Sequence, residues 1–172
     1  FSIKSSQKIF QGLWPLFHSM ADRAVFDEAH WAEDSRVNNI MAEVTMETLR
    51  RTQGAGHQEP TLWIHDYHLM EVPGIVRRLA GQDGLSCRIG YFMHIPFPPW
   101  DMIKIHPWKD IFLQGILGSD LIGFQCQDFA LNFIDCCERG RGTRVDRRAM
   151  VVEHGAGGRQ VRVMACPLGV PF

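Results

Sequence analysis

The hydrophobic positions of this 172-residue chain alternate between short apolar runs and longer amphipathic stretches. Apolar runs that predict buried strands lie at residues 62–64, 89–93 and 121–124. Apolar residues spaced by three or four positions predict helices from about residue 33, over 72–79 and over 126–137. Two valine-rich runs around residues 155–158 (GAGG) predict a β-hairpin near the C-terminal end.

The first predicted helix carries its apolar side chains at Val37, Ile40, Met41 and Val44. This spacing places them on one face, which we expect to point toward the core. A polar stretch at residues 53–60 ends the helix. The residues before this helix, up to residue 31, are rich in aromatic side chains and predict irregular structure.

Strands that alternate with helices predict an α/β fold with a parallel sheet, and fully apolar strands predict that helices cover both faces. In such sheets, ligands bind at the carboxyl ends of the strands. Asp66 lies just after the first predicted strand, between His65 and His68, and His94 lies just after the second. Carboxylate and imidazole groups can hold the hydroxyl groups of a sugar.

Ordinary structural roles for Asp66 and His94 remain open at this stage, as does a core or lid role for Trp14, whose indole could also cover a sugar. The histidines and Asp66 have the side chains of a metal site but no recognised zinc spacing, so we expect no metal. The formal charge of −1 argues against a general nucleic-acid or membrane binder.

Five cysteines without a Cys-x-x-Cys pair indicate reduced, mostly buried thiols and a cytoplasmic protein. No apolar run reaches the roughly 18 residues of a membrane span, and the start carries no signal-peptide pattern. Because the chain begins with Phe1 and ends without a polar tail, we interpret it as a piece of a longer protein.

Five segments together resemble the trehalose-6-phosphate synthase family of glycosyltransferases, in order and at similar spacing. They are residues 13–18 (LWPLFH), 63–70 (WIHDYHLM), 89–98 (IGYFMHIPFP), 120–125 (DLIGFQ) and 166–170 (CPLGV). Details around residues 98–101 and 151–155 look most like the animal branch, that of invertebrates. The resemblance implies a retaining transfer of glucose from UDP-glucose to glucose 6-phosphate, in trehalose biosynthesis and without a cofactor.

The resemblance also implies a glycosyltransferase B fold, in which two Rossmann-like domains face each other across a cleft. Residues 1–172 then form part of the N-terminal, acceptor-side domain, and the C-terminal donor-binding domain is absent. By the same resemblance, Trp14 and Asp66 contact glucose 6-phosphate and His94 lies at the reacting sugar. We therefore expect the isolated chain to be inactive. A homo-oligomer of the parent protein remains open.

Two positions depart from the family pattern, because an acceptor-binding Tyr falls on Ser5 and a frequent Asn falls on Phe10. They favour an alternative, a non-catalytic relative that senses sugar phosphates or regulates. Trp14, Asp66 and His94 favour the enzyme more strongly. A purely structural module is the third hypothesis, and long motifs in order argue against it.

Overall fold

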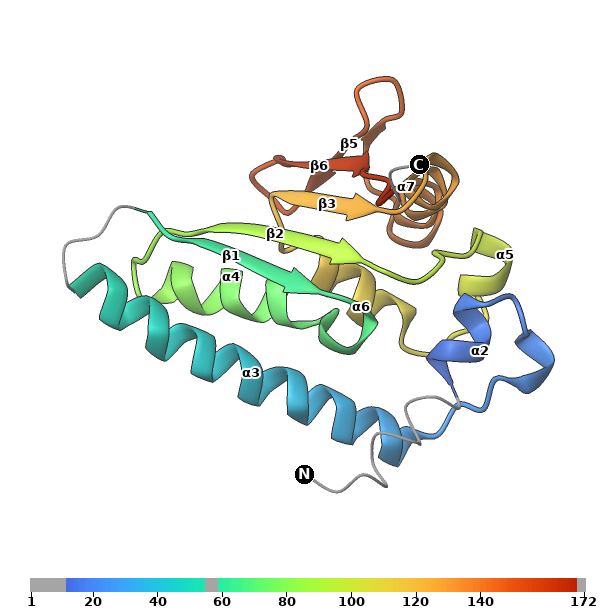
Figure 1. The fold of residues 1–172 in the computed structure, drawn as a ribbon, viewed down its shortest axis with the longest axis horizontal. Helices are drawn as coiled ribbons and strands as arrows, with labels where there is room; N and C mark the ends of the chain where they lie inside the picture. Colours follow the sequence, from blue (N-terminus) through green and yellow to red (C-terminus); the bar gives the residue numbers. More distant parts are fainter. Residues whose placement is uncertain (1–11, 55–58, 170–172) are drawn as a thin grey trace.

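A computed structural model of the chain, which describes residues 12–54 and 59–169, contains a six-stranded sheet (Figure 1). Its strands are β1 (Thr61–His65), β2 (Arg88–Met93), β3 (Leu121–Phe124), β4 (Val145–Asp146), β5 (Val151–His154) and β6 (Arg159–Ala165). The sheet order is β1-β2-β3-β6-β5-β4. The first three pairs are parallel, and β5 pairs antiparallel with β4 and β6. The three predicted strands and the predicted hairpin are therefore confirmed.

Short helices account for most of what the sequence pattern missed. The helices are α2 (Leu13–Phe17), α3 (Glu28–Gly54), α4 (Val72–Gln82), α5 (Trp100–Ile103), α6 (Lys109–Ile116) and α7 (Gln127–Arg141), with 3-10 turns η1 (Ala21–Arg23) and η2 (Tyr67–Leu69). The prediction of irregular structure up to residue 31 was wrong for α2 and for the first turn of α3. Ser5 and Phe10 lie outside the described residues.

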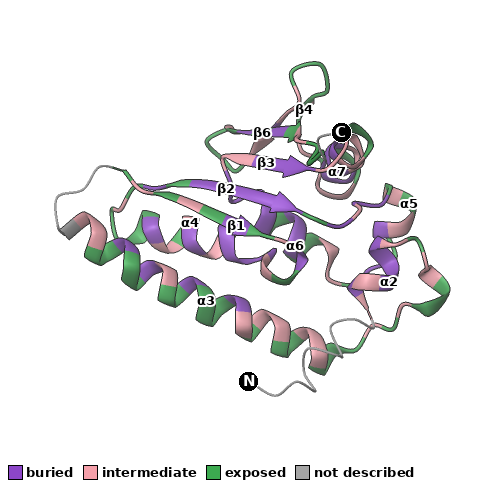
Figure 2. Cartoon of the chain, in the orientation of Figure 1, coloured by how far each residue is buried: buried purple, intermediate pink, exposed green. Residues whose placement is uncertain are grey.

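Helix α3 is confirmed as a helix, but its predicted core face was wrong. Ile40, Met41 and Val44 are exposed, while the residues that point inward include the polar Asn38. Asn38 is 3% exposed because its side-chain amide bonds the backbone of the segment after β1. The predicted stripe therefore faces outward, and Figure 2 shows buried and exposed positions on opposite sides of α3. The inward face carries Asn38 together with a second apolar stripe, Ala42, Met46 and Leu49.

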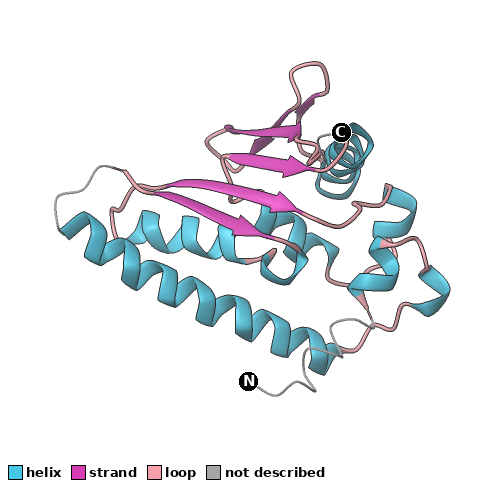
Figure 3. Ribbon diagram, viewed as in Figure 1, coloured by secondary structure: helices cyan, strands magenta, loops and turns pink. Residues whose placement is uncertain are grey.

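The two faces of the sheet are covered very differently. On one face, neighbouring residues of the four parallel strands form a fully buried row, which consists of Ile64, Tyr91, Ile122 and Val163. Figure 3 shows α3, α4 and α6 on one side of β1 and β2. The opposite face carries Trp63, which is 52% exposed, and Met164, which is 38% exposed.

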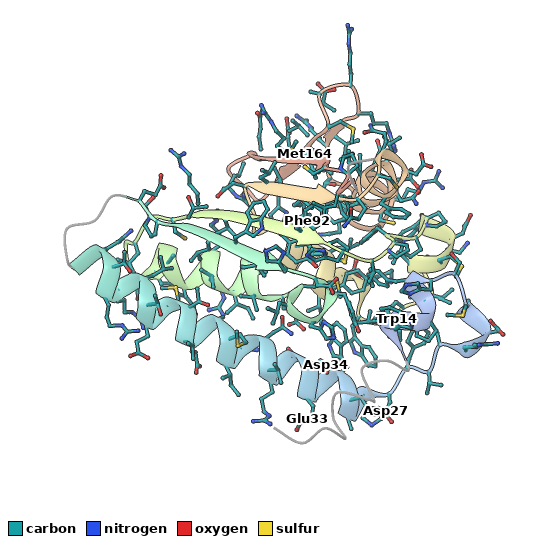
Figure 4. The ribbon with its side chains drawn as sticks, in the orientation of Figure 1. Trp14, Asp27, Glu33, Asp34, Phe92 and Met164 are labelled. Carbon is teal, nitrogen blue, oxygen red and sulfur yellow. The ribbon has the colours of Figure 1, made fainter. Side chains whose placement is uncertain are left out.

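The expectation of helices on both faces was therefore wrong for the described part of the chain. On the open face, the aromatic side chains lie across glycines of the neighbouring strand. A Cβ atom on Gly90 would lie 2.1 Å from the ring of Trp63, and one on Gly123 would lie 2.6 Å from the ring of Phe92. Phe92 is consequently only 6% exposed without a helix above it (Figure 4).

The cysteines match the expectation of mostly buried thiols: Cys87, Cys136 and Cys137 are buried, and all five cysteines are free. Burial raises the pKa of Cys136 and of Cys137, which keeps both thiols protonated at neutral pH. Of the helices within residues 12–54 and 59–169, none is long and apolar enough to cross a membrane.

The open sheet face predicts self-association of the chain. We expect a mass above the monomer's 19.7 kDa by light scattering at tens of micromolar, because exposed apolar side chains on an edge strand promote pairing. Trp63→Lys should weaken the association about tenfold, since it places a charge on the exposed face of this edge strand.

The matched control is Val44→Lys on α3, which adds the same charge at an equally exposed apolar position, 55% against 52%. This variant should associate as the unmodified chain does. A sharp monomer peak for the unmodified chain would count against the prediction, and an equal effect of both variants would show that charge alone governs association.

Candidate functional site

Asp66 follows directly after β1 and has a strained backbone. Its φ of 69° and ψ of 169° lie in a region that is almost restricted to glycine. Such a conformation costs roughly 1–3 kcal/mol and persists only where the surroundings impose it. Strained residues of this kind cluster at functional sites, so Asp66 is the first candidate on structural grounds as well.

Hydrogen bonds from the neighbouring strand hold Asp66 in this conformation. Its backbone N–H donates to the carbonyl of Phe92 at 2.8 Å, and its own carbonyl accepts from the Tyr91 hydroxyl at 3.0 Å. The carbonyl also accepts the N–H of Leu69 at 3.2 Å. The carboxylate accepts the backbone N–H of His94 at 3.3 Å through Oδ1. The structure thus brings together Asp66 and His94, which follow two neighbouring strands.

His94 pairs with a second histidine at the same edge. Its Nε2 lies 2.9 Å from Nδ1 of His65, so one nitrogen donates and the other accepts. The two rings are stacked, with centroids 5.1 Å apart. Because Nε2 of His94 is engaged in this way, Nδ1 is the ring atom left for a ligand. The sequence pattern placed the imidazole of His65 at the ligand edge and in the metal hypothesis, but it did not indicate that His65 pairs with His94.

Trp14 reaches the site from α2, which lies beyond the carboxyl ends of β1 and β2 (Figures 1 and 4). Its ring lies 6.1 Å from the ring of Tyr67, the residue after Asp66, and 3.9 Å from that of His18. The sequence motifs of Trp14 and Asp66, which are far apart in the chain, therefore meet at one end of the sheet.

The turn after Asp66 is anchored to α3 by a buried amide. Nδ2 of Asn38 donates to the carbonyl of His68 at 2.9 Å, and Oδ1 accepts the N–H of Glu71 at 3.1 Å. The adjacent Tyr67 is buried, and its hydroxyl makes no hydrogen bond among the described residues. Burial raises the pKa of Tyr67 to about 12 and lowers that of His68, so both side chains are neutral at pH 7.

These groups offer hydrogen-bonding atoms of the kind that a polyhydroxylated ligand uses. A carboxylate, two histidines and an indole lie at one strand edge, with both acceptors and donors for hydroxyl groups. Among the residues the structure describes, no group of three or more histidine, cysteine or acidic side chains is arranged to hold a metal ion. His65 and His94 face each other, whereas the ring of His68 lies tilted against that of Tyr67, with the centroids 3.8 Å apart.

Curated proteins similar to this chain share a large part of its sequence. A bifunctional trehalose-6-phosphate synthase/phosphatase from Thermoproteus tenax is 38% identical over 93% of the chain, and a UDP-forming α,α-trehalose-phosphate synthase from Pichia angusta is 33% identical over 92%. The chain spans 20% and 31% of the length of these two relatives.

Solved structures of the same kind superpose on the chain. A trehalose-phosphate synthase from Burkholderia xenovorans in complex with glucose 6-phosphate has a TM-score of 0.80 at 28% identity, over 98% of this chain and 36% of that one. An E. coli structure with bound UDP-2-fluoro glucose also has a TM-score of 0.80, at 27% identity, over 99% and 36%. The glycosyltransferase family 20 model matches residues 4–172, and the chain therefore belongs to glycosyltransferase family 20.

Proposed function

We propose that this chain is the acceptor side of a UDP-forming α,α-trehalose-phosphate synthase and that it binds glucose 6-phosphate at the carboxyl ends of β1 and β2. Trp14, Asp66 and His94 make the contacts with the sugar. The observation that carries the proposal is the strained Asp66, whose carboxylate is fixed against His94 at the edge where α/β proteins bind ligands.

The chemistry assigned to each residue follows from its atoms. The carboxylate of Asp66 accepts hydrogen bonds from sugar hydroxyls, and the ring of His94 donates or accepts through Nδ1. Trp14 covers an apolar face of the sugar and supplies one N–H. None of these side chains is arranged with a partner that would activate it as a nucleophile, so they act by orienting the sugars and by stabilising charge.

In this proposal the chain is part of the N-terminal domain, and the donor UDP-glucose is held mainly by a second domain outside it. The structure in complex with glucose 6-phosphate and the one with a UDP-glucose analogue support a site between two substrates in the family. The matched chains are about three times as long as this one, which leaves room for such a domain. We place the protein in the cytoplasm, where both sugar substrates are small soluble molecules.

The test is titration of the chain with glucose 6-phosphate by calorimetry or NMR, together with Asp66→Ala and Asp66→Gly. Saturable binding is expected for the unmodified chain, weakened about 10- to 100-fold in both variants, because hydrogen bonds to a charged group are worth about 1.5–3 kcal/mol. Asp66→Gly is the sharper variant. Glycine adopts the backbone conformation without strain, so this variant should be at least as stable as the unmodified chain.

The matched control is Asp83→Ala, which removes a carboxylate that pairs with Arg50 at the far end of α4. Its affinity for glucose 6-phosphate should equal that of the unmodified chain. A folded unmodified chain that binds no glucose 6-phosphate would contradict the proposal, and undiminished binding by Asp66→Gly would remove Asp66 from the site.

Glucose 6-phosphate binding is also what a regulatory relative would retain. The two functions differ in turnover, because only the enzyme transfers glucose from UDP-glucose. Synthesis of trehalose 6-phosphate by a protein that contains this chain and a donor-binding domain would decide for the enzyme. Asp66→Gly in that protein should lower the rate as it lowers acceptor affinity.

A further inference from the structure

The hydroxyl of Tyr91 lies buried beneath the proposed acceptor site. Tyr91 lies on β2 with its side chain on the covered face of the sheet and is 0% exposed. A phenol buried this deeply needs a partner for its hydroxyl. It donates to the carbonyl of Asp66 at 3.0 Å, and among the described residues its other contact of this kind is a weak one to the sulfur of Met93 at 3.8 Å.

The hydrogen bond from Tyr91 ends on Asp66, the residue with the strained backbone conformation. With φ at 69° and ψ at 169°, Asp66 relaxes toward an ordinary conformation unless its peptide groups are held. Three of the bonds that hold it come from β2 and the residue after it: the Tyr91 hydroxyl, the Phe92 carbonyl and the His94 N–H. Of these three, only the first is donated by a side chain, so a substitution at Tyr91 removes it and leaves both the strand backbone and the Asp66 carboxylate in place.

Burial raises the pKa of Tyr91 well above its ordinary value. The phenol therefore keeps its proton and remains a donor throughout the physiological range. The donor is also rigid, since its ring is packed within the covered row of the sheet.

We propose that Tyr91 is a positioning residue, whose buried hydroxyl holds the strained peptide of Asp66 so that the carboxylate is presented to the acceptor sugar. The acceptor part of this inference rests on the proposed function. Tyr91 itself is buried on the covered face of the sheet, so it has no surface with which to contact the sugar. It acts through the carbonyl of Asp66, on the side opposite to the one that the sugar contacts.

The test is Tyr91→Phe, which removes one oxygen atom and keeps the ring. The expected result is an affinity for glucose 6-phosphate about tenfold weaker, the effect of one hydrogen bond transmitted to the site. Amide exchange at Asp66 should accelerate by a similar factor, and its carbonyl 13C resonance should move as expected for a weaker hydrogen bond. A general loosening of the core would not shift the carbonyl resonance of Asp66 selectively.

The matched control is Ile122→Val, because Ile122 is the register partner of Tyr91 on β3, is equally buried and loses one methylene group. This variant should keep the affinity, the exchange rate and the carbonyl resonance of Asp66. Equal losses of affinity in the two variants would overturn the inference. So would an unchanged amide exchange rate and carbonyl resonance of Asp66 in Tyr91→Phe. If the unmodified chain binds no glucose 6-phosphate, the proposed function fails, and amide exchange together with the carbonyl resonance still decides whether Tyr91 holds Asp66.

Discussion

Gly115→Ala is expected to destabilise the chain by about 2–3 kcal/mol, measured as a lower midpoint of denaturant unfolding. Helix α6 packs so closely against the start of α4 that a Cβ atom on Gly115 would lie 2.4 Å from the carbonyl oxygen of Met70 and 2.6 Å from Cα of Glu71, the two residues before α4. Both atoms belong to the backbone, so no side-chain rotation relieves the overlap. The helices must separate, which costs more than the gain in helix propensity from alanine.

The control is Gly81→Ala, a glycine of α4 around which an added Cβ atom would meet nothing within 4 Å. It should stabilise the chain by about 0.4–1 kcal/mol, because alanine lowers the entropy of the unfolded state. Equal effects of the two substitutions would refute the close helix contact. Since Met70 and Glu71 follow the turn after Asp66, Gly115→Ala should also weaken glucose 6-phosphate binding, and Gly81→Ala should not.

The sequence pattern predicted strands better than helices because a strand can be identified without knowing which of its two faces is buried. Each of the parallel strands β1, β2 and β3 carries a short apolar run, which is sufficient to identify it. The orientation of α3 was not predictable in this way, because Asn38 is buried for its hydrogen bonds and not for its hydrophobicity. The buried face continues from Asn38 through a second apolar stripe, Ala42, Met46 and Leu49, and apolar spacing alone did not distinguish it from the exposed one.

At the site, the sequence identified the residues that follow the strand ends but not what holds them. Asp66 and His94 were predictable because ligands bind at the carboxyl ends of parallel strands. The pairing of His65 with His94 and the bond from Tyr91 to Asp66 depend on the register of β1 against β2. That register fixes which side chains lie side by side, and no local pattern in either strand contains it.

Acidification should remove roughly 3 kcal/mol of stability through one buried histidine, His106. It is 2% exposed, and its ring contacts Phe26, Trp31, Trp108 and Phe112, with centroids 4.9–5.7 Å apart. Burial, and to a lesser degree the charge of Lys109, lowers the pKa of His106 from 6.5 to about 4. Its Nδ1 accepts the N–H of Trp108 at 3.2 Å, which requires that this nitrogen be unprotonated.

The unfolded chain takes up a proton on this histidine near pH 6.5, whereas the folded chain does so only near pH 4. Between these values the unfolded state binds more protons, so stability falls as the pH falls through this window. Denaturant midpoints at pH 7.5 and pH 4.5 measure the loss. In His106→Gln the loss should be markedly smaller, and parallel curves for the two proteins would contradict the assignment.

A half-buried carboxyl on α3, that of Asp34, works in the opposite direction and offsets part of this loss. Burial and the nearby charge of Glu71 raise the pKa of Asp34 from 3.8 to about 6. The folded state then binds more protons between these values, and acidification stabilises it. Because the group is about half exposed, solvent screening limits this contribution to about 1 kcal/mol. Asp34→Asn should therefore steepen the acid loss, whereas His106→Gln flattens it, and this opposite response of two neighbouring variants separates histidine protonation from a general effect of acid on the fold.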